Sequence, residues 1–246
     1  MKRFVLAFGN FFFKWRDTAF SLIFLAAFFT AGVAVLNPDG YSGDVWTSIV
    51  GLILASAGEF VRSITIGYAY IKRGGLNKKI YAETLQNKGV FAHTRNPMYL
   101  GNLLIVTGAI IFVNNSAFYL LVLPLFYFIY YAIIAAEEDF LSNRFGNDYE
   151  KYKAEVPNRI LPGNLSKWSA SVQEMEFSWK RLIRKEHSTA VVNFGALCLY
   201  GITKFHLRYD MPLGAFRGLW IAFAGLLAFQ LLAETLKRTG RLAEGA

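Results

Sequence analysis

Long uncharged stretches alternate with basic polar segments along this chain of 246 residues. The clearest stretch is 117–136, which has 20 consecutive positions without a charged side chain, and 18–36 is also uncharged. A helix needs about 20 mostly apolar residues to cross the hydrocarbon core of a bilayer. Each of these two stretches therefore predicts a membrane span.

Further apolar segments repeat this pattern, and three small polar residues at 114–116 predict a tight turn between two of the helices. The whole pattern predicts an all-α fold, a polytopic membrane helical bundle with about six transmembrane helices. The further segments are 46–71, 99–113, 190–203 and 218–233.

The distribution of Lys and Arg orients the predicted bundle. The N-terminal tail has four of these residues, 72–98 has six and 143–187 has nine, whereas 37–45 has none. Segment 204–217, with three, departs from the alternation. Because cytoplasmic loops of membrane proteins are enriched in Lys and Arg, we expect both termini, both long polar segments and any active site on the cytoplasmic side.

Composition agrees with a membrane protein. Hydrophobic residues make up 54% of the chain and charged residues 17%, against roughly 45–50% and 25% in soluble domains. A net charge of +9 together with a mean hydropathy of +0.33 favours an anionic membrane surface over a nucleic-acid partner. The single Cys198 excludes an intramolecular disulfide and a cysteine-based zinc site.

The sequence divides into four parts. Residues 1–45 hold an N-terminal transmembrane helix and an outer loop, and 46–162 hold the candidate chemistry. The aromatic and basic residues of 163–187 predict an interfacial amphipathic helix. Residues 188–246 then form a C-terminal extension of two transmembrane helices.

Two groups of charged residues interrupt the apolar pattern. Glu59 and Arg62 are three positions apart within an apolar segment, so they can pair on one helix face, as a functional or a purely structural pair. Glu137, Glu138 and Asp139 follow the longest span. Carboxylates at the C-terminal end of a helix oppose its dipole, so they form either a solvated collar or a site with a cation nearby. Adjacent side chains point about 100° apart, so only one of Glu137 and Glu138 can face a given site.

A proline-led motif stands at the start of the third predicted span. It runs Arg95-Asn96-Pro97-Met98-Tyr99-Leu100-Gly101. Proline suits the first turn of a helix, where its missing N–H has no partner in any case, and Gly101 permits close approach of a backbone or ligand.

A short helix is predicted at Asp148–Val156. Gly146 is placed to cap the preceding helix, Asn147 and Glu150 form a weak capping box, and Pro157 ends the helix. Tyr149 and Tyr152 share one face of it. Other sequence signals are missing: there is no GxGxxG, P-loop or HExxH, and the three histidines are scattered, so we expect neither Rossmann nucleotide binding nor a metal site.

Taken in order, these motifs resemble the isoprenylcysteine carboxyl methyltransferase and phospholipid methyltransferase group. These are integral-membrane enzymes that use S-adenosyl-L-methionine, and the resemblance covers roughly 46–162. It implies that the proline-led motif, the stretch before it and the first acid of the pair surround this cofactor. The cofactor-binding residues implied are Glu83, Thr84, Leu85, Gln86, Phe91, Asn96, Pro97, Met98, Tyr99, Glu137 and Tyr149.

Two positions depart from the family pattern. Asn96 stands where the carboxyl methyltransferases usually have histidine. Where those enzymes carry a substrate-binding arginine, residues 131–134 hold no cation. A prenylcysteine carboxylate is ionised at neutral pH and needs a cation partner when buried, whereas a lipid amine must lose a proton and gains from a carboxylate nearby. We therefore favour a lipid-amine acceptor in the membrane.

The implied active site combines these groups. Glu138 and Arg95 are the catalytic candidates, with Glu138 as base or counter-charge. Arg62, Tyr152 and Arg159 are the candidates for binding the acceptor, and any of Arg62, Arg95 and Arg159 can supply the cation that a carboxylate acceptor needs. The alternatives are carboxyl O-methylation of an isoprenylcysteine, a sterol-reductase-like enzyme that uses NADPH, and a small membrane transporter or lipid-binding protein.

Overall fold

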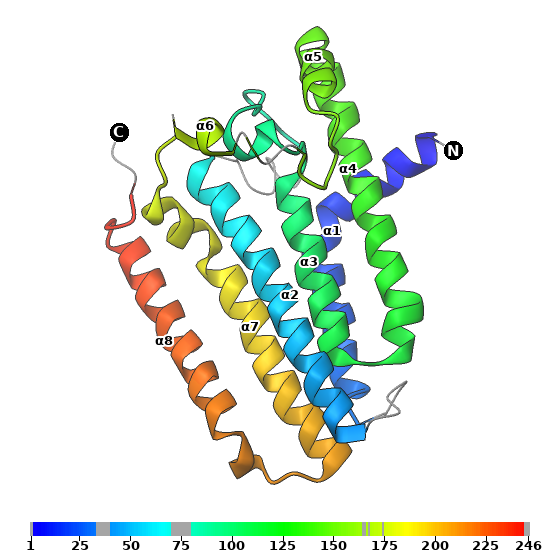
Figure 1. The fold of residues 1–246 in the computed structure, drawn as a ribbon, viewed down its shortest axis with the longest axis vertical. Coiled ribbons are helices and arrows are strands. Elements are labelled where there is room, and N and C mark those ends of the chain that lie inside the picture. The colour runs from blue at the N-terminus through cyan, green and yellow to red at the C-terminus, as the bar shows by residue number, and fades with distance from the viewer. Residues whose placement is uncertain are drawn as a thin grey trace.

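The structure is a computed structural model that describes residues 2–32, 40–69, 80–163, 166, 168–173 and 175–243. Within these ranges the chain is helical and has no strand. The end of the first predicted span at 33–36, the residues 37–39 after it and the basic residues at 72–79 lie outside the described residues. The long helices lie side by side as one bundle (Figure 1): α1 (Lys2–Phe29), α2 (Gly40–Tyr68), α3 (Pro97–Val113), α4 (Leu123–Phe145), α7 (Trp179–Tyr209) and α8 (Arg217–Arg238).

Shorter elements connect the long helices. Two of them, α5 (Asn147–Glu155) and α6 (Trp168–Gln173), lie at one end of the bundle with η1 (Gly89–Ala92). At this same end α1 begins and α8 ends (Figure 1). The π-turn η2 (Phe118–Val122) leads into α4, and η4 (Leu213–Phe216) leads into α8.

Four described helical segments are long and apolar enough to cross a membrane: Gly40–Tyr68, Phe118–Phe145, Trp179–Tyr209 and Leu213–Arg238. Helix α3 is also apolar but has 17 residues, and α1 carries charged side chains near its middle, at 14, 16 and 17, in addition to Lys2 and Arg3 at its start. The all-α membrane bundle is thus confirmed, whereas the number of six spans is not.

The first helix differs from its predicted position at 18–36. Helix α1 begins at Lys2 and ends at Phe29, because the charged residues near its middle interrupt the hydropathy but not the apolar spacing. Phe8 and Phe12 of this early part pack against the core. Gly9 lies against the backbone of Ala132 in α4, at a distance that leaves no room for a side chain.

The predicted amphipathic helix at 163–187 is also different in the structure. Its first part is the six-residue α6, and its second part belongs to α7, which begins at Trp179. The Ser178 hydroxyl accepts a hydrogen bond from the backbone N–H of Arg181 at 3.2 Å and caps α7. Glu186 and His187 are consequently buried in the bundle rather than placed at the membrane surface.

Helices α2 and α3 approach each other through glycines. A Cβ atom at Gly58 would lie 2.5 Å from the carbonyl oxygen of Gly101, and one at Gly108 would lie 2.5 Å from the carbonyl oxygen of Gly51. Small residues at such spacing let two membrane helices come into backbone contact. The close approach expected of Gly101 is therefore to the backbone of α2.

Buried charged residues hold the helices together at the end of the bundle opposite α5. The Asp44 carboxylate of α2 accepts hydrogen bonds from Arg208 at 2.8 Å, Asn114 at 2.6 Å and Tyr209 at 2.7 Å. Lys204, which is fully buried, donates to the Phe112 carbonyl at 2.8 Å. Lys204 and Arg208 thus belong to the interior of α7, which explains why segment 204–217 departed from the alternation of basic loops.

The predicted turns have the expected backbone. Asn114 ends α3 in the left-handed region, with φ 51°, so the helical hairpin turns where the three polar residues predicted it. Gly146, also at φ 51°, caps α4, and α5 follows directly. The capping box is not formed, because the residue before α5 is Gly146 and no side chain caps the helix.

Candidate active site

The start of α3 is held by the segment that follows α5. Pro97 occupies the first turn of the helix. Before it, the backbone N–H of Arg95 donates to the Asn158 carbonyl at 3.0 Å, and the Thr94 hydroxyl donates to the Ile160 carbonyl at 2.8 Å. The Asn96 amide reaches the Arg159 carbonyl at 3.0 Å rather than capping α3. The proline-led motif therefore begins the helix while its preceding residues are pinned to 158–160.

Glu138 joins this arrangement to α4. Its carboxylate oxygens accept from Arg95 Nε at 3.1 Å and from Arg159 Nε at 2.9 Å, and Asn96 Nδ2 lies 3.3 Å from Oε1. The acidic C-terminal end of α4 was expected either to be solvated or to have a cation nearby, and these two arginines are such cations. Glu138, Arg95 and Arg159 thus form a clamp, the Glu138 clamp, between α4, the start of α3 and the chain after α5.

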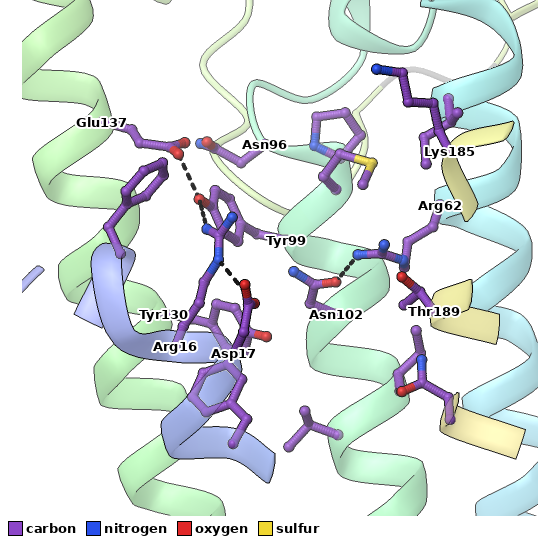
Figure 2. Close-up of a pocket in the computed structure, with 18 of the residues that line it drawn as sticks. Arg16, Asp17, Arg62, Asn96, Tyr99, Asn102, Tyr130, Glu137, Lys185 and Thr189 are labelled. Carbon is purple, nitrogen blue, oxygen red and sulfur yellow. Dashed lines mark hydrogen bonds and ion pairs between the residues drawn. The ribbon is translucent and has the colours of Figure 1, made fainter. Parts of the chain in front are cut away.

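Glu137 has different partners, as expected of adjacent residues on a helix. The Tyr99 hydroxyl donates to Glu137 Oε1 at 2.6 Å, and Arg16 Nη1 of α1 donates to the same hydroxyl at 3.3 Å (Figure 2). Tyr99 is 6% exposed, so this chain of hydrogen bonds lies within the protein. Helices α1, α3 and α4 meet at these three side chains.

A cavity of about 1060 Å³ lies beside this chain of hydrogen bonds. Ten of the residues implied as cofactor-binding line it, and so do three more of the candidates, Arg62, Arg95 and Tyr152. Three candidates, Glu83, Glu138 and Arg159, do not belong to its lining. The ten cofactor candidates in the lining are Thr84, Leu85, Gln86, Phe91, Asn96, Pro97, Met98, Tyr99, Glu137 and Tyr149.

Helix α5 covers one end of the cavity with two tyrosines. The Tyr149 and Tyr152 rings are 6.1 Å apart and both are buried. The Tyr152 hydroxyl donates to the Phe91 carbonyl at 2.8 Å, which ties α5 to η1. Burial raises the pKa of both hydroxyls well above the ordinary value, so they stay protonated and act as donors at neutral pH.

Arg62 lies on another side of the cavity. Its Nε donates to Glu186 Oε1 at 2.6 Å, and its Nη1 donates to Asn102. The sequence offered Glu59 on the same helix as a partner; the structure adds Glu186 of α7, 124 positions away. No local spacing could show that pair, because it depends on how α2 and α7 pack.

Sequence reasoning missed the contribution of two helices. Helix α1 lines the cavity with Phe13, Arg16, Phe20, Phe24 and Phe28, among others. Helix α7 lines it with Arg181, Lys185, Thr189, Val192, Asn193, Ala196 and Leu197, among others. Two signals were available in the sequence. One was the charged pair Arg16 and Asp17 in the apolar pattern of α1, which the sequence pattern assigns to the N-terminal tail. The other was the basic cluster at 180–185, which was expected at the lipid surface.

The polar lining falls into two groups in Figure 2. Glu137, Tyr99 and Arg16 lie on the side of α1 and α4, and Arg62, Lys185 and Thr189 lie on the side of α2 and α7. Aromatic and aliphatic side chains make up much of the remaining lining, with further polar residues among them. Such a site can hold a ligand with both cationic and anionic groups and a second, largely apolar molecule beside it.

Comparison with known proteins agrees with the sequence resemblance. Neither a curated protein nor a solved structure matches the chain significantly. The family model described as phospholipid methyltransferase matches residues 46–148. This segment contains most of α2, the proline-led motif and the acid pair, but neither α1 nor α7. Residues 46–148 are thus similar to the phospholipid methyltransferase family, and the resemblance found in the sequence is confirmed over this segment.

Proposed function

We propose that this protein is an integral-membrane methyltransferase that transfers a methyl group from S-adenosylmethionine to the amine of a membrane phospholipid. The observation that carries the proposal is the cavity itself, because the proline-led motif and Glu137, the first acid of the pair, meet in its lining together with the apolar side chains of α1 and α7. Its volume of about 1060 Å³ is at the upper end of the range for sites that hold one drug-sized ligand, about 300–1000 Å³. A second molecule can therefore enter beside the donor.

The lining residues fit the chemistry of S-adenosylmethionine. The donor carries a sulfonium, an ammonium and a carboxylate, and the lining offers Glu137 for a cation and Arg16 for an anion. The rings of Phe91, Tyr99 and Tyr149 can face the sulfonium, since aromatic faces attract cations. When bound, this group supplies an activated methyl.

The chain's own residues then hold and shield the reacting groups. Tyr99 fixes the Glu137 carboxylate with its 2.6 Å hydrogen bond, so that carboxylate faces the cavity in one orientation. Tyr149 and Tyr152 close the end under α5 and exclude water, which strengthens electrostatic interactions inside. Most of the rate enhancement comes from this positioning.

Glu137 takes the role that the sequence gave to Glu138. A carboxylate near a lipid amine can accept its proton or balance the positive charge that develops there. Glu138 is bonded to two arginines and stands outside the cavity lining, whereas Glu137 lines the cavity. We therefore assign Glu138 and Arg95 to holding the site together.

The acceptor class rests on the family and on charge. Cations do line the cavity, at Arg62, Arg181 and Lys185, so the lack of a cation at 131–134 does not by itself disfavour a carboxylate acceptor. The phospholipid methyltransferase match favours a phospholipid amine over an isoprenylcysteine. The basic segments support a cytoplasmic location for the α5 end of the bundle and for the proposed active site.

The test uses the full-length protein purified in detergent. It is incubated with methyl-labelled S-adenosylmethionine and total membrane lipid, and the labelled lipid is identified. Label in an amine-bearing phospholipid that falls more than tenfold in Glu137→Gln, but not in the exposed control Glu155→Gln, supports the proposal. Label in a carboxyl ester, or no label in any lipid, contradicts it.

A further inference from the structure

The cavity continues into a slot between α1 and α7, two helices outside the family-matching segment. At the far end the helices touch: the Phe28 and Tyr200 rings are 5.4 Å apart, and Arg208 Nε donates to the Ala31 carbonyl at 2.8 Å. Nearer to α5, side chains of both helices line the cavity instead. The slot is therefore closed at one end and opens towards α5.

The walls of the slot are apolar along most of its length. Phe20, Phe24 and Phe28 line it from α1, and Val192 and Ala196 line it from α7. Val192 is 66% exposed, so this wall is open to the surroundings, which for a membrane protein are lipid. A long hydrocarbon chain can enter such a slot sideways from the bilayer.

The mouth of the slot is cationic. Arg181 and Lys185 are one turn apart on α7, and both line the cavity. In all, five cationic side chains and two carboxylates belong to the cavity lining, at Arg16, Arg62, Arg95, Arg181, Lys185, Asp17 and Glu137. Arg62 and Arg95 are paired with Glu186 and Glu138, two acids outside the lining, so the cationic character of the cavity is concentrated at the mouth of the slot. S-adenosylmethionine itself carries a net positive charge, so an anionic group suits a second ligand at this mouth better than another cation.

The dimensions of the slot fit one leaflet of a membrane. Leu197 is the deepest position of α7 in the lining and lies twelve residues after Lys185. At a rise of 1.5 Å per residue, the distance between them along the helix axis is about 18 Å. Half of the hydrocarbon core is about 15 Å. Thr189 and Asn193 present polar groups between these ends, where the ester groups of a lipid would lie.

We infer that the slot between α1 and α7 binds the acceptor lipid, with its phosphate at Arg181 and Lys185 and an acyl chain extending to Phe28. Lys and Arg are the common partners of phosphate groups in proteins. This inference rests on the function proposed above, and it assigns selection of the acceptor to helices that the family segment does not include. The amine then extends from the phosphate into the cavity, whose lining includes Glu137 on the side of α1 and α4.

The first experiment measures methyl transfer by the full-length protein. Arg181→Gln and Lys185→Gln are compared with Lys180→Gln, which is exposed on the same helix and outside the cavity lining. We expect Arg181→Gln and Lys185→Gln each to raise KM for phosphatidylethanolamine about tenfold, with kcat and the affinity for S-adenosylhomocysteine changed less than twofold. Lys180→Gln should leave all three quantities unchanged. Transfer to a long-chain amine without phosphate should be unaffected. An unchanged KM for the phospholipid, an equal loss with both acceptors, or weakened nucleoside binding would overturn the assignment.

A second experiment does not depend on methyl transfer. Binding of labelled phosphatidic acid, diacylglycerol and N-acetyl-S-farnesylcysteine to the purified protein is compared, with inorganic phosphate as competitor. We expect phosphatidic acid to bind at least tenfold more tightly than diacylglycerol, to lose this advantage in Lys185→Gln, and to resist millimolar phosphate. Preference for the farnesylcysteine carboxylate, displacement by free phosphate, or no preference would overturn the phosphate site. If the wild type binds phosphatidic acid in this way but methylates no lipid, the proposed function fails while the slot assignment stands.

A third variant tests the apolar part of the slot. Ala196→Trp places a large ring between α7 and α1. We expect KM for dioleoyl phosphatidylethanolamine to rise at least tenfold while that for the dihexanoyl lipid changes less than threefold. Equal effects on both lipids would show that the acyl chain lies elsewhere, and unchanged binding of S-adenosylhomocysteine verifies that the variant is folded.

Discussion

Tyr99 of α3 and Glu137 of α4 stand 38 positions apart in the chain and are joined by a 2.6 Å hydrogen bond inside the bundle. The bond connects the proline-led motif to the first acid of the pair. It also fixes which of the two adjacent carboxylates faces the cavity, since Glu138 is turned towards Arg95 and Arg159. The two motifs that the sequence singled out therefore meet through these two side chains.

The first prediction concerns this hydrogen bond. In Tyr99→Phe the ring remains but Glu137 loses its donor, and a hydrogen bond to a charged group contributes about 1.5–3 kcal/mol. We expect the affinity for S-adenosylhomocysteine, measured by calorimetry, to fall by about tenfold or more. Tyr127→Phe, which removes an exposed hydroxyl that is hydrogen-bonded to Thr107 outside the cavity lining, is the control. Equal affinity in Tyr99→Phe and wild type would remove the Tyr99–Glu137 bond from the donor site.

Arg16 carries the second prediction, because α1 lies outside the family-matching segment. Its guanidinium bonds the Tyr99 hydroxyl and lines the cavity. We expect Arg16→Gln to weaken S-adenosylhomocysteine binding about tenfold, while Lys14→Gln, an exposed residue two positions earlier, leaves it unchanged. A matching test uses a nucleoside analogue that lacks the amino-acid carboxylate. Its affinity should be nearly the same in Arg16→Gln and wild type, and a tenfold loss there as well would show that Arg16 acts on the fold rather than on the carboxylate.

The Glu138 clamp gives a prediction that separates support from catalysis. Glu138→Gln keeps the shape of the side chain but leaves the Arg95 and Arg159 guanidiniums without their carboxylate. Because the Glu138 side chain is 16% exposed, we expect a loss of about 1–3 kcal/mol, below the roughly 3–5 kcal/mol for breaking a fully buried pair. Thermal unfolding in detergent should show a Tm several degrees lower.

The corresponding kinetic measurement decides the role of Glu138. If Glu138 only supports the site, the pH profile of methyl transfer in Glu138→Gln should keep the shape of the wild-type profile, with a lower rate at every pH. A catalytic base would shift or abolish one limb of the pH profile. That second result would return Glu138 to the role that the sequence suggested.

Local patterns in the sequence predicted the site better than they predicted its surroundings. The proline start of α3, the turn at Asn114 and the cap at Gly146 each depend on a few neighbouring residues, and the structure has them where they were expected. The partners of Arg62 and Glu138 depend on residues 124 and 43 positions away, so only the packing of the helices reveals them.

The roles of α1 and α7 were missed for a related reason. Charged residues at 14–17 lower the hydropathy of α1, and the basic cluster at 180–185 is typical of a membrane surface. Both features have a second explanation, a polar cavity wall, that becomes visible only when the two helices are placed around the cavity. Hydropathy finds where a chain can cross a bilayer, but it does not tell which polar side chains face a cavity.

The fourth prediction concerns the contact between α2 and α3. Gly58→Ala places a methyl group 2.5 Å from the Gly101 carbonyl oxygen, whereas Gly218→Ala in α8 meets nothing within 4 Å. We expect Gly58→Ala to lower the Tm by several degrees, because overpacking a tight interface costs about 1–3 kcal/mol. Gly218→Ala should leave the Tm unchanged or raise it slightly, since alanine is a better helix former than glycine. Equal Tm values for the two variants would contradict the backbone contact between α2 and α3.

The fifth prediction addresses the buried charges at the end of the bundle opposite α5. Asp44 is 1% exposed and bonds Arg208, Asn114 and Tyr209, and Lys204 lies 3.7 Å from its carboxylate. In Asp44→Asn the two buried cations lose their counter-charge, which typically costs about 3–5 kcal/mol. We expect a large fall in Tm and a greatly reduced yield of folded protein. Asp210, which follows α7, is exposed, so Asp210→Asn should have the Tm and yield of the wild type.

The double variant Asp44→Leu with Lys204→Met gives the sharper version of this test. Removing Asp44 together with one of its two cations leaves the net charge of the cluster unchanged, and Arg208 keeps the carbonyl oxygens of Ala31, Val113 and Asn114 as acceptors. Apolar replacements of buried ion pairs are often neutral or stabilising. We expect this variant to recover part of the Tm lost in Asp44→Asn, with methyl transfer unchanged because the cluster lies at the opposite end of the bundle from α5. Loss of transfer at a restored Tm would show instead that the cluster takes part in the reaction.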